Sequence, residues 1–291
     1  MTMRQKLTRR TFLRWGAAAG AAMAAATPRR AAAQEAAPAF RFGVSTIMYH
    51  DSPFEVAIEE IAKTGCQAVD VWDGGGRTPV NHMEWVEKNG PDKARQLVES
   101  FGLKLWAFSI YWSPGGSHLE RLEWLKQAGG EVAVLGGGAG ADQPVEAGIR
   151  GLLPLVEKAE ALGVRIAGEN HGGSSLNSIA SMREFVALAK SPALGIALAP
   201  YHVMGAGESV PEAIEAVGSK LFFFYAWQQA PGMRELPGDG TLDFLPVLKA
   251  LRKVDYRGHL GIFTHTHVPK DEMTSAVIAA REYLEGLAER L

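Results

Sequence analysis

Eight short apolar runs recur along the chain, and each is followed by a segment with helical character. The runs are rich in Val, Ile, Leu and Phe and are mostly uninterrupted by polar residues, which is typical of strands buried on both faces. The expected strands span residues 40–47, 68–72, 103–110, 131–135, 164–167, 194–199, 221–227 and 260–263. The helices expected after them span residues 52–63, 92–101, 119–128, 143–162, 178–189, 210–217, 244–253 and 271–291.

This alternation indicates an α/β protein with a parallel sheet covered by helices. Eight units over about 250 residues match the size of a closed barrel. We therefore predict a single (β/α)8 TIM barrel over residues 40–291. A doubly wound open sheet is the alternative, but it would need a glycine-rich fingerprint near the first strand, and the sequence has none. Gly136, Gly137 and Gly138 lack the Lys and Ser or Thr of a phosphate-binding loop and indicate a tight turn.

The first 33 residues have the order of an export signal. Arg9 and Arg10 precede Phe12 and Leu13, in a stretch that resembles the twin-arginine signal, and an alanine-rich run and small residues follow. We predict a twin-arginine signal peptide at 1–33 and a short linker at 34–39, and hence a periplasmic or otherwise extracytoplasmic protein. The alanine-rich run is too short to span a bilayer stably, so no membrane span is expected once the signal is removed.

Removing this segment changes the charge of the chain. The segment holds seven basic residues and no acidic ones, so the remainder has 23 basic residues against 32 acidic ones, a net charge of −9. A surface of this sign repels phosphate backbones, so nucleic acid is not an expected partner. The sequence does not indicate an oligomeric state.

Glu169, Asn170 and His171 stand where the fifth expected strand ends. Charged groups are costly to place at the end of an apolar strand unless they have a role or a partner. Active sites of this fold lie at the carboxyl ends of the strands, which favours a function. The alternative is a strand end whose Glu169 pairs with a nearby Lys or Arg. Because side chains alternate along a strand, Glu169 and His171 are expected to share a face.

Six aromatic residues are expected at the same ends of the strands. Any one of them could be a core residue, but six in this location indicate a sugar-like ligand. The six are Trp72, Trp106, Tyr111, Trp112, Tyr201 and Trp227. Flat rings stack on the apolar faces of sugars, and their polar edges bind hydroxyls. We predict that substrate binds to Trp72, Trp106, Trp112, Asn170, His171, Tyr201, Trp227 and Gln228.

Four stretches, at residues 65–72, 161–171, 195–202 and 238–244, together resemble the xylose isomerase-like TIM barrels. This family includes sugar isomerases and epimerases, inosose dehydratases and endonuclease-IV-like enzymes, and the resemblance covers residues 40–291. It implies a divalent metal held by acids or His at the ends of strands five to eight. Glu169 matches the fifth-strand ligand, and His202 matches a His after the sixth strand. The other three ligand positions carry Ala199, Tyr225 and Phe263.

The histidines could form a different cluster. Phe263, His265 and His267 share a face if the eighth strand continues, so His265 and His267 would point toward the barrel mouth with Glu169 and His202. A metal site of Glu169, His202, His265 and His267 would suit a divalent transition metal better than magnesium. The alternatives are a metal-free acid/base set and histidines that merely line the wall.

The resemblance implies an exported enzyme of the sugar isomerase or epimerase type that removes a proton next to a carbonyl of a sugar or keto-sugar. Isomerisation, epimerisation, dehydration and lyase chemistry all remain open. Glu169 would be the base, and His202 and His265 would polarise or protonate oxygen. The alternative is a non-catalytic sugar-binding protein on a barrel that has lost its isomerase ligands. An abasic-site endonuclease is related by fold, but the acidic surface and the missing ligands oppose it.

Overall fold

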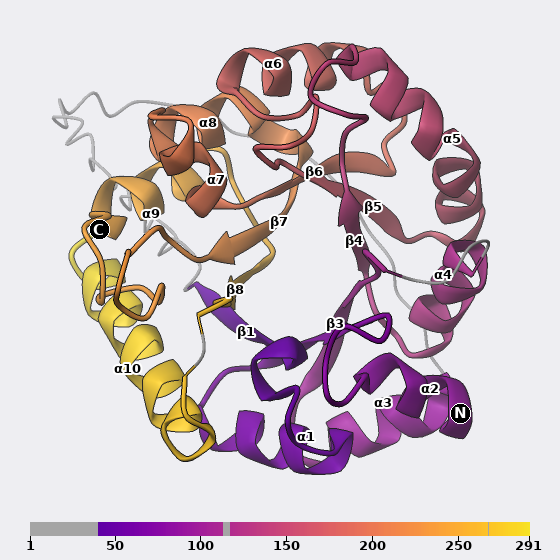
Figure 1. Ribbon diagram of the computed structural model, residues 1–291, viewed down its shortest axis with the longest axis vertical. Helices are drawn as coiled ribbons and strands as arrows, with labels where there is room; N and C mark the ends of the chain where they lie inside the picture. The colour runs from indigo at the N-terminus through magenta and orange to yellow at the C-terminus, as the bar shows by residue number, and fades with distance from the viewer. Residues whose placement is uncertain (1–39, 113–116, 267) are drawn as a thin grey trace, which may run out of the picture. The chain divides into compact units, whose positions relative to one another are not determined.

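In the computed structural model, the described residues are 40–112, 117–266 and 268–291. Within them, eight strands pair in parallel and in chain order, and β8 closes the barrel against β1 (Figure 1). The strands are β1 (Arg41–Ser45), β2 (Ala68–Trp72), β3 (Lys104–Ser109), β4 (Val132–Gly136), β5 (Arg165–Glu169), β6 (Leu194–Leu198), β7 (Leu221–Ala226) and β8 (His259–Ile262). The predicted (β/α)8 fold is confirmed. The predicted signal peptide and linker, at 1–33 and 34–39, lie outside the described residues.

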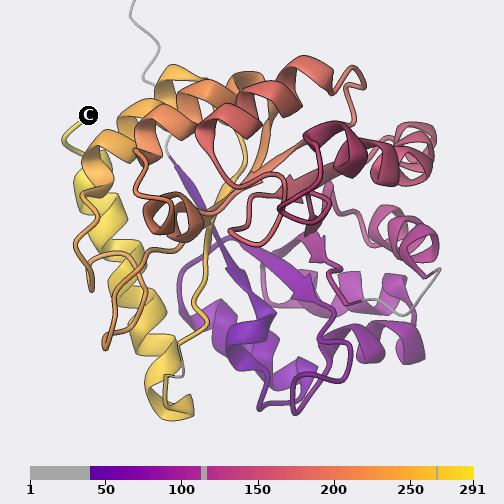
Figure 2. The same ribbon diagram turned by 45° about the horizontal axis from the view of Figure 1, so that its top comes forward.

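Helices surround the barrel on its outer side, as Figures 1 and 2 show from two directions. They are α1 (Phe54–Lys63), α2 (His82–Asn89), α3 (Pro91–Ser100), α4 (His118–Gln127), α5 (Val145–Leu162), α6 (Ile179–Leu188), α7 (Pro200–Gly205), α8 (Val210–Val217), α9 (Phe244–Lys253) and α10 (Lys270–Ala288). Short 3-10 helices, η1 (Thr46–Tyr49) and η2 (Gly218–Lys220), follow β1 and α8. None of the helices in the described part of the chain is both long and apolar enough to cross a bilayer.

Local sequence signals explain where several helices begin and end. Ser178 caps α6 by accepting a hydrogen bond from the Ser181 backbone, while the Ser181 hydroxyl accepts one from the Ser178 backbone. Gly163 ends α5 in the left-handed conformation, at φ 68°. The sequence analysis did not predict α2 and α7. Asn81 begins α2 by accepting hydrogen bonds from the backbone of Met83 and of Gly74, so its amide also ties down the loop after β2.

The barrel interior is filled by large rings below the carboxyl ends of the strands. Trp106 of β3 is fully buried and stacks on Phe223 of β7, with ring centroids 4.3 Å apart and planes 7° apart. One carboxyl is also fully buried in this interior. Asp70 accepts hydrogen bonds from the hydroxyls of Ser45 and Ser109, at 2.6 and 2.8 Å, and burial raises its pKa to about 6.

Close backbone contact fixes the end of β5. A Cβ atom placed on Gly168 would lie 2.6 Å from the Cα atom of Gly137, closer than any side chain can approach. Glycine at both positions therefore lets the end of β4 pack against β5. This contact explains Gly137 and Gly168 as a packing requirement, and it sets the backbone from which Glu169 projects.

Candidate active site

A cavity of about 400 Å³ opens at the carboxyl ends of the barrel strands, and we refer to it as the inner cavity. Glu169 at the end of β5 and three histidines line it, with an aromatic wall drawn from β2 and from the segments after β3, β6, β7 and β8. The residues of the lining are Trp72, Tyr111, Trp112, Gly136, Glu169, His171, Tyr201, His202, Trp227, Phe263 and His265. Its size is that of a small-molecule site, and its lining is mostly apolar with a few convergent polar groups.

Glu169 is the carboxyl group of the inner cavity. Glu169 is 8% exposed, and burial raises the pKa of its carboxyl group to about 8. The hydrogen bond from Tyr111 acts in the opposite direction and lowers this pKa. No Lys or Arg pairs with it among the described residues, so the alternative of an ion pair at a strand end is not supported there. A carboxyl in this state holds its proton at neutral pH and is a strong base once ionised.

His202 is the imidazole nearest to that carboxyl. Its Nε2 atom lies 3.9 Å from Oε1 of Glu169, and its ring centroid lies 4.3 Å from that of His171. Burial lowers the pKa of His202 to about 4, and the neighbouring His171 and His265 contribute in the same direction. At neutral pH both His202 and Glu169 favour their uncharged forms. The pair is therefore an acid/base couple rather than an ion pair.

A chain of hydroxyl groups runs from Glu169 into the barrel. Tyr111 hydrogen-bonds to Glu169, and its hydroxyl oxygen lies 3.0 Å from that of Tyr225. The Tyr225 hydroxyl lies 3.4 Å from Oγ of Ser109, which donates to Asp70. These residues connect the two buried carboxyl groups, and the sequence analysis assigned Tyr111 and Tyr225 no role in this chemistry. A strand-end position marks Tyr111 as a candidate, but the sequence does not show which group it contacts.

The aromatic wall holds the polar groups in place. Tyr201 stacks on Trp227, with centroids 4.1 Å apart and planes 7° apart. Trp227 also meets His202 and His265 edge-on, at centroid distances of 5.4 and 5.0 Å. Trp72 also contacts His265, at a centroid distance of 6.0 Å. His265 is exposed, yet desolvation lowers its pKa.

Three residues predicted to bind substrate lie elsewhere. Trp106 is buried one layer deeper in the barrel, in the stack with Phe223. The amide of Asn170 is used by the backbone of Ala199, with which it makes two hydrogen bonds, of 2.7 and 3.3 Å. The amide of Gln228 donates to the Leu236 carbonyl and accepts from the backbone of Leu242. These amides brace the loops behind the cavity instead of lining it.

The predicted metal ligands do not come together as a metal site among the described residues. No three His, Cys, Asp or Glu side chains in the described ranges form a group that could hold a metal ion. Glu169, His202 and His265 all line the inner cavity but do not meet this requirement, and His267 lies outside the described residues. Two of the other expected ligand positions carry the packed rings of Tyr225 and Phe263, 5.1 Å apart. Among the described residues, the donor set therefore does not fit a divalent metal.

Two sequence models of known families and signals match the chain. The model of the family described as xylose isomerase-like TIM barrel matches residues 58–285. The twin-arginine translocation signal matches residues 6–26 and indicates export by that route. A protein of Escherichia coli (strain K12) assigned as an L-ribulose-5-phosphate 3-epimerase is 27% identical over 144 residues. That match spans 47% of this chain and 50% of the relative. This chain therefore spans about half of the relative's length.

Solved structures share the fold at low sequence identity. A D-psicose 3-epimerase, determined in the presence of D-fructose, superposes with a TM-score of 0.69 at 18% identity, over 86% of this chain and 99% of the other. The IOLI protein with a bound zinc atom superposes with a TM-score of 0.69 at 16% identity, over 86% of this chain and 99% of the other. An L-ribulose 3-epimerase superposes with a TM-score of 0.67 at 17% identity, over 86% of this chain and 95% of the other. At these identities the likeness establishes the fold.

Proposed function

Because this chain belongs to the xylose isomerase-like TIM barrel family, we propose that it is an exported enzyme that removes a proton from the carbon next to a carbonyl group of a sugar or keto-sugar. The observation that carries the proposal is the state of Glu169. It is a buried carboxyl without a cationic partner in the described part of the chain, and its pKa is raised to about 8 in a cavity of sugar size.

The geometry supports distinct roles for the two groups. Ionised Glu169 would take the carbon-bound proton, since a base of raised pKa accepts it more readily than an ordinary carboxylate. His202, which stays neutral at physiological pH, would donate an N–H to the carbonyl oxygen and stabilise the negative charge that develops there. Their separation of 3.9 Å allows both to contact one substrate fragment. His265, which also contacts Trp227, would hold a neighbouring oxygen.

The fate of the resulting enediolate selects the reaction. Delivery of a proton by a second group to the opposite face of the same carbon gives an epimer, and delivery to the neighbouring carbon gives an isomer. Loss of a leaving group from the adjacent carbon gives a dehydration or lyase reaction. Named relatives include sugar 3-epimerases, which supports epimerisation among these possibilities. The route of export supports a periplasmic location. No step is assigned to a metal, because the donor set that the described residues provide does not fit one.

A second candidate function is sugar binding without catalysis. It is favoured by the loss of carboxylate and imidazole at the positions of Ala199, Tyr225 and Phe263, while the aromatic wall of the inner cavity remains. The raised pKa of Glu169 has no purpose in this account, since a neutral ligand would be bound as well by an amide.

Proton exchange with deuterated water separates the two functions. The protein is incubated in D₂O with a panel of aldoses, ketoses and 3-keto-sugars, and carbon-bound protons are followed by NMR. The enzyme account expects loss of one proton signal from at least one sugar, and at least a 100-fold slower loss with Glu169→Gln, as an order-of-magnitude expectation for a general base. Sugar binding by both proteins with no exchange would support the binding function.

A further inference from the structure

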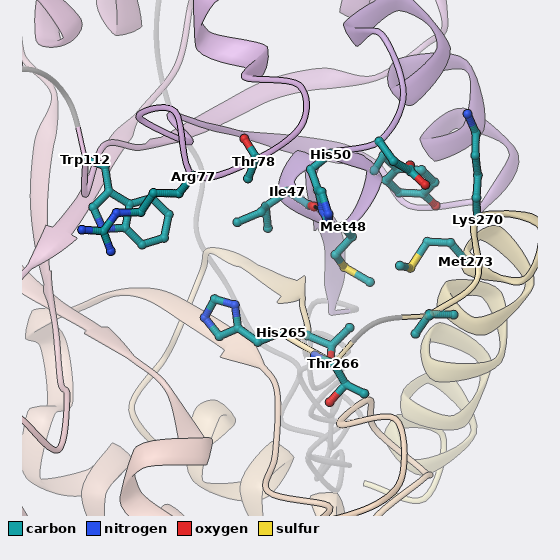
Figure 3. Close-up of a pocket in the computed structure, with 14 residues that line it drawn as sticks. Ile47, Met48, His50, Arg77, Thr78, Trp112, His265, Thr266, Lys270 and Met273 are labelled. Carbon is teal, nitrogen blue, oxygen red and sulfur yellow. Dashed lines mark hydrogen bonds between the residues drawn. The ribbon is translucent and has the colours of Figure 1, made fainter.

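A second cavity, of about 350 Å³, adjoins the inner one, and we refer to it as the outer cavity. It lies between η1, the loop after β2, and the segment that joins β8 to α10 (Figure 3). Trp112 and His265 line both cavities. The two spaces are therefore neighbours across one pair of side chains, and the proposed function uses only the inner one.

The outer cavity has an apolar floor and a polar rim. Ile47, Met48 and Met273 are buried residues of its lining, whereas His50 and Asp51 are more exposed. Such a lining suits a ligand that has both apolar faces and hydroxyl groups, as a sugar ring does.

His50 is held in a defined orientation. Its Nδ1 atom lies 2.6 Å from the carbonyl oxygen of Ile47, so this nitrogen carries the proton and donates. In the neutral ring, Nε2 is then a hydrogen-bond acceptor. The backbone N–H of Val80 donates to the carbonyl of His50 at 2.8 Å, which joins the loop after β2 to the end of η1. Two walls of the outer cavity are thus fixed to each other before any ligand binds.

The charges of the outer cavity do not converge as a phosphate site requires. Figure 3 shows Arg77 laid against Trp112 at one end of the cavity and Lys270 at the other. The guanidinium of Arg77 lies 5.0 Å from the indole centroid. Asp51 is part of the same lining, and its carboxylate would repel a phosphate. The arrangement is better suited to a neutral polyhydroxyl group, to which Asp51 and His50 offer acceptors and Arg77 offers donors.

We propose that the outer cavity is a second sugar subsite, so that the substrate is a disaccharide or a comparable glycoside. This inference rests on the proposed function of the inner cavity. The ring that loses its proton lies beside Glu169, and the attached ring lies over Met48 and Met273. The bond between the rings passes between Trp112 and His265, the two side chains that both cavities share.

The test compares a keto-disaccharide with the monosaccharide that forms its reacting ring. Dissociation constants are measured by calorimetry, and exchange in D₂O by NMR, for the wild-type protein, Asp51→Asn and Asp271→Asn. Asp271 is an exposed carboxylate on α10 that lies outside both linings and serves as the matched control. We expect the disaccharide to bind about tenfold more tightly than the monosaccharide. Asp51→Asn should remove most of this advantage without changing monosaccharide binding, and Asp271→Asn should change neither.

Equal affinity for the two sugars would overturn the second subsite, as would an Asp51→Asn effect of the same size on both. A monosaccharide phosphate that binds more tightly than the disaccharide, and loses this advantage in Arg77→Gln, would assign the outer cavity to an anion instead. The two proposals fail separately. If the protein prefers the disaccharide but exchanges a proton of no sugar, the second subsite is supported and the catalytic function is contradicted. If it exchanges a proton of the monosaccharide but does not prefer the disaccharide, the catalytic function is supported and the second subsite is contradicted.

Discussion

The Nε2 atom of His202 lies 3.9 Å from Oε1 of Glu169, and burial shifts the pKa values of the two side chains in opposite directions, to about 4 and about 8. Each shift favours the neutral form of its group. At pH values between about 4 and about 8, a neutral carboxyl group therefore faces a neutral imidazole, which keeps one N–H. The predictions below follow from this pair and from the residues that hold it.

The contribution of Glu169 to stability should fall as the pH rises from about 4.5 to about 8. In this window the unfolded chain has released the proton that the folded protein still holds, so deprotonation favours unfolding. Gln at this position has no proton to lose. We expect Glu169→Gln to raise the melting temperature relative to the wild-type protein at pH 8, with a smaller difference at pH 5. Scanning calorimetry at both values measures this, and an equal difference at the two pH values would contradict the raised pKa.

Removing the Tyr111 hydroxyl should move the rising limb of the pH–rate profile to higher pH. Its hydrogen bond to Glu169 lowers the pKa of that carboxyl, in opposition to burial, so Tyr111→Phe should raise it further. Tyr201→Phe is the matched control, because it removes a hydroxyl from the same cavity without touching the bond to Glu169. Exchange rates measured from pH 6 to pH 10 give both midpoints. An unchanged midpoint in Tyr111→Phe would show that this bond does not act on the base.

The contact behind Glu169 should be intolerant of a methyl group. In Gly168→Ala, the new Cβ would meet backbone 2.6 Å away, and overpacking of this kind costs about 1–3 kcal/mol. Gly172→Ala is a nearby control with no atom within 4 Å of its added Cβ. Urea unfolding at pH 7 compares the free energies of unfolding. Similar midpoints for the two variants would mean that the ends of β4 and β5 do not need this approach.

Sequence reasoning located the strands and the edge of the barrel that carries the site, because both depend on local apolar patterning and on the known polarity of the fold. It missed α7, a helix of 6 residues that begins at Pro200 directly after β6. It placed Asn170 and Gln228 in the site because they stand at strand ends. Whether an amide faces a ligand or a neighbouring loop is decided by contacts distant in sequence, such as that of Gln228 with Leu242.

Trp106 shows a related limit. It was grouped with Trp112, yet it lies in the middle of β3, and a strand rises by about 3.3 Å per residue. A few residues therefore separate the ligand-facing layer from the packed layer below it. The pairing of Glu169 with Tyr111, and of Tyr111 with Tyr225, joins three strands or their ends, and no spacing within one strand predicts it.

Removing metal ions should leave the reaction intact. The described side chains form no group of three metal ligands, and the rings of Tyr225 and Phe263 pack at two of the family's ligand positions. After dialysis against a chelator, we expect the exchange rate to change by less than about twofold, well inside the tenfold change that loss of about 1.4 kcal/mol would produce. A loss of activity that zinc restores would contradict the metal-free account and return the histidine-bound transition metal to consideration.

The pH dependence of carbon-bound proton exchange tests the role of Glu169 most directly. The rate of exchange in D₂O is measured from pH 5 to pH 10 for the wild-type protein and for Glu169→Gln, on the sugar that the NMR panel identifies. We predict a wild-type rate that rises with pH to a plateau, with a midpoint near 8, and a variant in which this rise is abolished. A midpoint near that of an ordinary carboxyl, or exchange by Glu169→Gln within a few-fold of the wild-type rate, would contradict Glu169 as the base.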